Sequence, residues 1–184
     1  MPRFLLGFVF GLLILPVFGW LYFRFGYAPV ATASSPMPFE KQLAHSALRA
    51  RIRKEAPRSS PVQATEENYQ AAVHLYRSHC ALCHGLPRQD RSATSKGMYP
   101  KPPELFKGHG VTDDPVGETY WKVANGIRLT GMPAFRTVLS DDEMWQVSIL
   151  LANANKPVPP TALDILRRAQ PPPAELNPQV EPTQ

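Results

Sequence analysis

The stretch RSHCALCHG, residues Arg77 to Gly85, decides the fold of this chain. It places Cys80 and Cys83 three residues apart with His84 directly after the second, and the chain has 2 cysteines in all. Residues three apart lie on one side of a helix, so both sulfurs can face one group while the histidine turns back towards it. The spacing Cys-x-x-Cys-His is the attachment signature of c-type haem, in which the sulfurs bond the porphyrin and the histidine is an axial iron ligand.

Three other kinds of site use paired cysteines, and each fits the motif less well. A thioredoxin-like redox pair needs no histidine and starts a helix after a strand, whereas this pair ends a helical pattern. A structural zinc site normally has four protein ligands, and the other histidines show no finger-like spacing. A structural disulfide across so short a loop would leave His84 without a role. The sequence therefore predicts one covalent haem c.

An apolar run without charge, FLLGFVFGLLILPVFGWLYF, extends over 20 residues from Phe4 to Phe23. As a helix it spans roughly 30 Å, which is the thickness of a bilayer core. The alternative is a cleaved secretory signal, because the stretch Ala31-Thr32-Ala33 offers a small-residue cleavage site. The apolar core of a signal is about 7 to 15 residues long, shorter than this run. We therefore expect residues 4–23 to be an uncleaved transmembrane anchor, preceded by a cytoplasmic stub at residues 1–3.

The formal net charge of +5 is unevenly distributed. Residues 1–64 carry 8 Lys and Arg against 2 acidic residues, whereas the rest of the chain carries 12 against 13. Anionic headgroups or an acidic partner fit this basic segment beside the anchor, and nucleic acid is not expected as a partner of an exported segment.

Positive charge and haem chemistry give opposite orientations for the anchor. Counting basic residues places the C-terminal part inside, but c-type haem is attached on the outer side of bacterial membranes, and soluble domains cross largely regardless of charge. We expect a single-pass protein of a bacterial inner membrane with its N-terminus in the cytoplasm and its haem domain in the periplasm.

The pattern beyond the anchor predicts a basic linker at residues 24–64, with a solvated spacer helix at 39–55, and a folded haem domain at residues 65–155. Three helices are expected in that domain, the first capped by Thr65, the second starting at Asp114-Pro115 with Asp114 as cap, and the third opened by a capping box at Ser140. No convincing strand pattern appears, so the fold class is all-α. A Pro-rich tail follows at residues 156–184, with a short helical turn expected at 162–169.

The candidate for the sixth iron ligand is Met132, in the loop NGIRLTGMPAF at residues 125–135. A thioether is a soft neutral ligand that suits haem iron, and glycine and proline on either side favour an irregular loop. Met98 is the rival, but it lies only 14 residues after His84, which leaves little chain to reach the opposite haem face.

The motifs CALCHG, YPKPPEL and NGIRLTGMPAF, followed by a Trp-containing helix, resemble those of the class I cytochromes c and are similar to cytochrome c subunits of bacterial haem-copper oxidases. The resemblance covers roughly residues 65–155. It implies an all-α domain around one haem in which the first and last helices cross, bringing Tyr76 and its neighbours against Trp145 and its neighbours. It also implies that a carbonyl within Pro100 to Pro103 accepts the other ring N–H of His84. The anchor, the basic segment and the tail depart from the soluble members.

These features predict a membrane-anchored monohaem cytochrome c that passes single electrons between a redox protein donor and an acceptor in a periplasmic chain. No catalytic residue is expected, and Cys80, Cys83, His84 and Met132 hold the cofactor. The alternative is a cytochrome subunit of a larger respiratory complex, such as an oxidase, a nitric oxide reductase or a dehydrogenase. A gas sensor or peroxidase would need a labile or absent sixth ligand and a distal acid–base pair, whereas His79 and His109 fit surface or loop positions.

Overall fold

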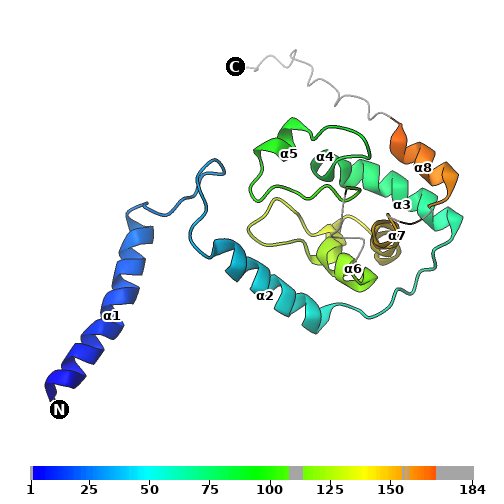
Figure 1. The fold of residues 1–184 in the computed structure, drawn as a ribbon. Coiled ribbons are helices and arrows are strands. Elements are labelled where there is room, and N and C mark those ends of the chain that lie inside the picture. The colour runs from blue at the N-terminus through cyan, green and yellow to red at the C-terminus, as the bar shows by residue number, and fades with distance from the viewer. Residues whose placement is uncertain (1, 108–113, 155, 157, 169–184) are drawn as a thin grey trace, which may run out of the picture. The chain divides into compact units, whose positions relative to one another are not determined.

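The structure is a computed structural model and describes residues 2–107, 114–154, 156 and 158–168. Its contacts divide the chain into two units, Met1–Ala47 and Leu48–Gln184, which are described separately. The described residues form helices without any strand, as the sequence predicts (Figure 1). Two features named in the sequence analysis lie outside the described residues, namely His109 and the tail after Arg168.

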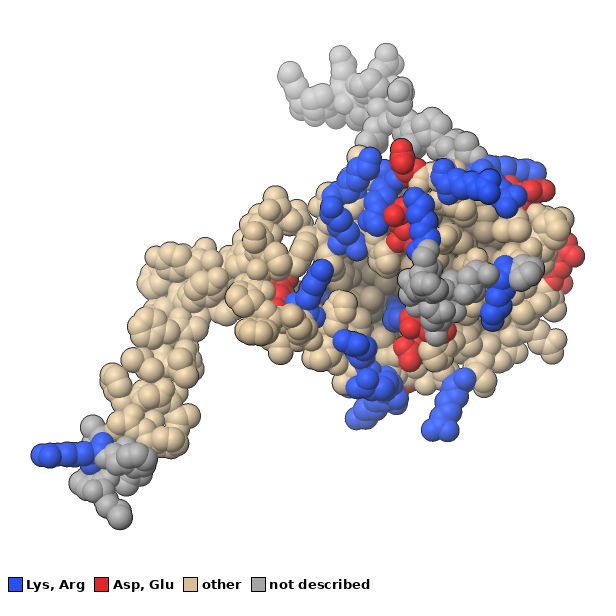
Figure 2. Space-filling model, viewed as in Figure 1, with Lys and Arg blue, Asp and Glu red and all other residues tan. Residues whose placement is uncertain are grey.

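The first unit contains α1 (Pro2–Arg24) and the first half of α2 (Glu40–Glu55). Within the described part of the chain, α1 is the helix that is long and apolar enough to cross a membrane, and none of the residues of its span, Gly7–Arg24, is buried. Its charged residues are Arg3 near the start and Arg24 at the end, and the face seen in Figure 2 is uncharged between its ends. Such a surface fits a hydrocarbon environment better than water.

The second unit begins with the last turns of α2. Its further elements are α3 (Glu66–His79), α4 (Ala81–His84), α5 (Ala93–Gly97), α6 (Val116–Asn125), the 3₁₀ helix η1 (Phe135–Thr137), α7 (Asp141–Ala152) and α8 (Pro160–Arg167). Helix α7 is central, because α3 and α6 both pack against it, and α8 packs on α3. Figure 1 shows α7 nearly end-on while α3 runs across the view, so these two helices cross as expected.

The helix starts follow local rules with one correction. The Thr65 hydroxyl accepts a hydrogen bond from the Asn68 N–H (3.3 Å), and Ser140 and Glu143 form the predicted capping box. The prediction that Asp114 caps α6 is wrong, because Pro115 holds that position. The Asp114 carboxylate instead pairs with the Lys122 ammonium at 2.7 Å, two turns along the helix.

The hydrophobic core has two parts that meet along α7. Tyr69, Val73 and Tyr76 lie on one stripe of α3 and are buried in the first part, together with residues from α7 and α8. Trp145 of α7 lies in the second part, where its ring stacks on that of Tyr120 at 4.0 Å between centroids. The helices α3 and α7 therefore cross as predicted, but the aromatic ring that stacks on Trp145 is that of Tyr120 on α6.

The spacer helix expected at 39–55 corresponds to α2, but its last turns are not solvated on all sides. Ile52 is only 2% exposed. The short turn expected at 162–169 is the eight-residue α8, which buries Ala162 and Leu166.

Candidate functional site

The motif lies where α3 ends and the short helix α4 begins. Cys80 is the residue between the two helices, and its carbonyl accepts hydrogen bonds from the Cys83 N–H (3.1 Å) and the His84 N–H (2.9 Å). Gly85 stops the turn with a φ of 77°, a left-handed conformation that glycine adopts without steric cost. One continuous helical path thus presents both sulfurs and the imidazole in sequence.

A buried tyrosine ties the two helices together. The Tyr76 hydroxyl donates to the Gly85 carbonyl at 2.7 Å, and its ring meets the Phe106 ring edge-on at 4.9 Å. Burial, and to a lesser extent the nearby Cys80, raises the pKa of Tyr76 well above its ordinary value, so the hydroxyl remains a donor at neutral pH. This bond fixes the end of α4 against the helix that carries Cys80.

The two thiols are free and half-buried. Burial, followed by the proximity of Cys83, raises the pKa of Cys80 to about 12. A redox dithiol needs a thiolate with a lowered pKa, so the environment of Cys80 disfavours thioredoxin-like chemistry. It suits sulfurs that become bonded to a largely apolar ring.

The imidazole of His84 is oriented by one hydrogen bond. Its Nδ1 lies 2.8 Å from the Pro103 carbonyl oxygen, which can only accept, so Nδ1 carries the proton and Nε2 keeps its lone pair. Burial lowers the pKa of His84, although the Pro103 bond opposes this shift. The expected carbonyl within Pro100 to Pro103 is therefore that of Pro103, and the ring is neutral with Nε2 available for a metal.

The loop that carries this carbonyl is held by charged side chains that the sequence analysis missed. The Arg91 guanidinium donates to the Pro102 carbonyl at 3.0 Å and pairs with the Glu104 carboxylate at 3.3 Å. Lys107 also pairs with Glu104 at 2.8 Å, and these contacts, that of Lys107 first, lower the pKa of Glu104. The run YPKPPEL was a signal for the loop, but no sequence pattern marks Arg91 as its support.

The segment containing Met132 is a closed loop. The Ile127 N–H donates to the Met132 carbonyl at 3.2 Å. The Thr130 hydroxyl donates to the Ile127 carbonyl at 2.7 Å and accepts from the Met132 N–H at 3.1 Å. Gly126 has a φ of 66°, and a Cβ there would stand 2.8 Å from the Met132 carbonyl oxygen, so the loop can close only on a glycine.

The structure brings both methionines to this loop. Met132 is half-buried and packs against the second core cluster, which includes Tyr120 and Trp145. The Met98 side chain lies against Gly131, where an added Cβ would overlap its terminal methyl group. The short chain distance between Met98 and His84 therefore does not keep Met98 away from the ligand loop.

The donor set fits haem c better than a bare metal ion. Nowhere in the described residues do three or more His, Cys, Asp or Glu side chains gather to hold a metal. Two half-buried sulfurs, an imidazole with Nε2 available and a thioether loop match the attachment and axial needs of this cofactor. Cys80, Leu105 and Phe106 all pack against the first core cluster, so Cys80 adjoins an apolar region.

Residues 67–149 match the model of the family described as cytochrome c oxidase, cbb3-type, subunit III. Among solved structures, a chain of the reducing HAO-like protein complex of Kuenenia stuttgartiensis matches at 20% identity and a TM-score of 0.47. That match covers 66% of this chain and 52% of the other, so this chain spans about half the length of that relative. No curated protein matches the chain. Residues 67–149 thus form a cytochrome c domain similar to that of subunit III of cbb3-type cytochrome c oxidases.

Proposed function

We propose that this protein is a membrane-anchored monohaem cytochrome c that passes single electrons between a redox protein donor and an acceptor on the periplasmic side of a bacterial inner membrane. The observation that carries the proposal is the Nδ1 bond from His84 to Pro103, beside the two free cysteines. Haem c, when bound, supplies the one-electron iron couple. His84 through Nε2 and Met132 through its sulfur would fill both axial positions, so we assign no substrate site and no catalytic residue.

Met132 is the better candidate for the sixth ligand because its own backbone is fixed. Both its N–H and its carbonyl are hydrogen-bonded inside the loop, which holds the start of the side chain in place. Met98 follows α5 as a half-buried residue, and its methyl group packs on Gly131. We assign Met98 the role of a packing residue that supports the ligand loop.

Exposed apolar side chains at the site fit outer-sphere electron transfer. Leu82 lies between the two cysteines and is 50% exposed, and Leu129 in the ligand loop is 92% exposed. Contact with a partner removes these side chains from water, and the buried apolar area is small enough that the partner can leave again readily. They suit a brief encounter near the edge of the bound haem.

The match to an oxidase subunit model supports a second candidate, in which this chain is the cytochrome subunit of a larger respiratory complex. The anchor and the basic segment fit both ideas. Isolation from native membranes in mild detergent separates them, because a subunit travels with larger partners whereas a tethered carrier does not.

Covalent attachment through Cys80 and Cys83 is the central test of the proposal. After denaturation in acid and organic solvent, the haem is expected to stay with the polypeptide, as followed by its absorption. The double variant Cys80→Ala and Cys83→Ala should release it and leave a poorly folded domain, because the cofactor completes the apolar core. Extraction of haem from the unaltered protein would remove the basis of the assignment.

A further inference from the structure

The end of α2 and the residues just after it contact α6 of the haem domain at two points. The Glu55 carboxylate accepts a hydrogen bond from the Trp121 indole N–H at 3.1 Å, and Ile52, one turn before Glu55, is buried. The carbonyl of Pro57 passes so close to Gly117 that an added Cβ would overlap it. Gly117 and Trp121 lie one turn apart on α6, so Glu55 and Pro57 contact the same face of α6.

This docked segment is strongly basic. Five exposed basic residues, which we call the α2 cluster, lie between residues 48 and 58 with a single acidic residue among them. They are Arg49, Arg51, Arg53, Lys54 and Arg58. The acidic residue, Glu55, is already engaged by Arg51 at 2.7 Å and by Trp121. The cluster therefore presents an excess of positive charge on a support that is part of the haem domain.

Chain continuity determines which anionic surface this cluster meets most often. Only 24 residues separate Arg24 at the end of α1 from Arg49. Nine of them are helical in α2, so the connection reaches at most roughly 65 Å when the other 15 are fully extended. A tether of this length gives a bilayer surface an effective concentration on the order of millimolar at the cluster, so weak attraction is enough for binding.

We propose that the α2 cluster binds anionic phospholipid headgroups and thereby holds the haem domain in one orientation on the membrane. The proposal rests on the proposed function, because it needs α1 in a bilayer. Each Lys or Arg near an anionic membrane surface contributes on the order of 1 kcal/mol, and salt screens the attraction. Because Glu55 and Pro57 tie the cluster to α6, lipid binding moves the whole domain rather than a loose arm.

The test uses the full-length holoprotein in lipid nanodiscs that contain a trace of headgroup-labelled fluorescent lipid. The haem absorbs the emission, so fluorescence quenching reports how close the domain lies to the bilayer. We expect stronger quenching in discs of phosphatidylcholine with phosphatidylglycerol than in phosphatidylcholine alone, and loss of the difference in high salt. The variant Arg53→Gln with Lys54→Gln should lower the docking equilibrium constant roughly 30-fold.

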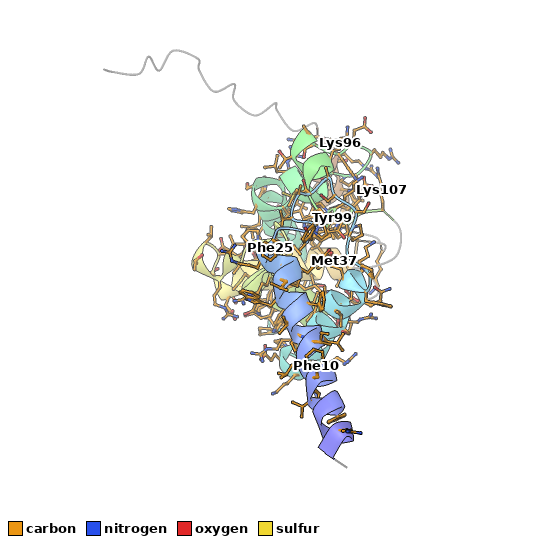
Figure 3. The ribbon with its side chains drawn as sticks, turned by 90° about the vertical axis from the view of Figure 1, so that its left-hand side faces the viewer. Phe10, Phe25, Met37, Lys96, Tyr99 and Lys107 are labelled. Atoms are coloured by element: carbon orange, nitrogen blue, oxygen red, sulfur yellow. The ribbon has the colours of Figure 1, made fainter. Side chains whose placement is uncertain are left out.

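The matched control removes the same charge elsewhere in the domain. Lys96, on α5 and labelled in Figure 3, and Lys101 are exposed, and the variant Lys96→Gln with Lys101→Gln should leave the quenching unchanged. Equal quenching in discs with and without phosphatidylglycerol would overturn the proposal. An acidic protein surface would then remain as the partner of the cluster. An equal loss in both variants would overturn it too, because it indicates diffuse attraction. Haem content and disc retention, measured in the same preparation, report separately on the proposed function.

Discussion

At the scale of single residues, two methionines lie at the candidate site and only one of them is assigned to iron. Met132→His is expected to keep the iron six-coordinate and low-spin while lowering its reduction potential, because imidazole donates more strongly to ferric iron than a thioether does. Met132→Ala should open the site to carbon monoxide, followed by absorption spectroscopy. Met98→Ala should lose only its packing on Gly131. If Met98→Ala alone abolishes the sulfur-to-iron charge-transfer band, the assignment is wrong.

Thr130 determines how firmly the Met132 backbone is held. Its hydroxyl makes two hydrogen bonds inside the loop, to the Ile127 carbonyl and from the Met132 N–H. Thr130→Val keeps the shape but removes both bonds, each worth about 1 kcal/mol. Imidazole added to the ferric protein should therefore displace the methionine up to roughly 30-fold more readily. Thr130→Ser keeps the hydroxyl and is the control. Equal imidazole affinities in the valine and serine variants would show that the hydroxyl does not position the ligand.

The residues proposed to bind the cofactor are easier to read from sequence than the residues that position them. Cys80, Cys83 and His84 are adjacent in a motif whose spacing follows from one helical turn. Arg91 and Thr130 act through backbone carbonyls, and which carbonyl comes within reach depends on the path of each loop. Local sequence does not specify that path. The approach of Met98 to Gly131 was missed for the same reason.

At the scale of elements, the capping box of α7 links helix stability to pH. The Ser140 backbone N–H donates to the Glu143 carboxylate at 2.7 Å, and this bond, followed by that of the Ser140 hydroxyl, lowers the pKa of Glu143 below its ordinary value of 4.5. The unfolded chain keeps the ordinary pKa, so it binds the proton first as the pH falls. The stabilisation is therefore complete above that value and is lost as the pH falls towards the lowered pKa.

Glu143→Gln should accordingly be less stable than the unaltered protein at neutral pH, with the difference shrinking in acid. Denaturant unfolding at a series of pH values measures this difference, and most other carboxylates cancel in the comparison because both proteins carry them. Glu67→Gln, on the first turn of α3, is a control for the charge change. If the difference in the free energy of unfolding between the two proteins does not change with pH, the charge of Glu143 does not contribute to the stability of the helix.

The capping residue of a helix was predictable where it bonds to a residue close by in sequence. It was not predictable where the candidate side chain has a more distant partner. Thr65 and Ser140 cap their helices through residues three positions away. At α6, the Asp114 carboxylate forms an ion pair with Lys122, two turns away, and Pro115 takes the N-cap position. The pattern of α2 gave its length correctly but not the burial of Ile52.

At the scale of the whole molecule, the apolar helix α1 and the helices around the Cys-x-x-Cys-His motif fall in different units. This division follows from composition, since residues 4–23 carry no charge whereas charged residues recur along residues 24–168. The sequence therefore predicted that an apolar helix precedes a separate helical domain. The contacts of Glu55 and Pro57 with α6 were not predictable, because Trp121 and Gly117 lie far along the chain from them.

Separate units imply that the haem domain does not need its anchor in order to fold. Replacing residues 1–24 with a cleavable export signal should release a soluble red protein with an unchanged absorption spectrum, because neither Cys80, His84 nor Met132 belongs to the first unit. The unaltered protein should stay in the membrane through carbonate washing, since a bilayer-spanning apolar helix is not removed by high pH. N-terminal sequencing that starts at Ser34 would instead establish a cleaved signal. A released domain that aggregates or loses its spectrum would show that α1 contributes to the fold around the haem.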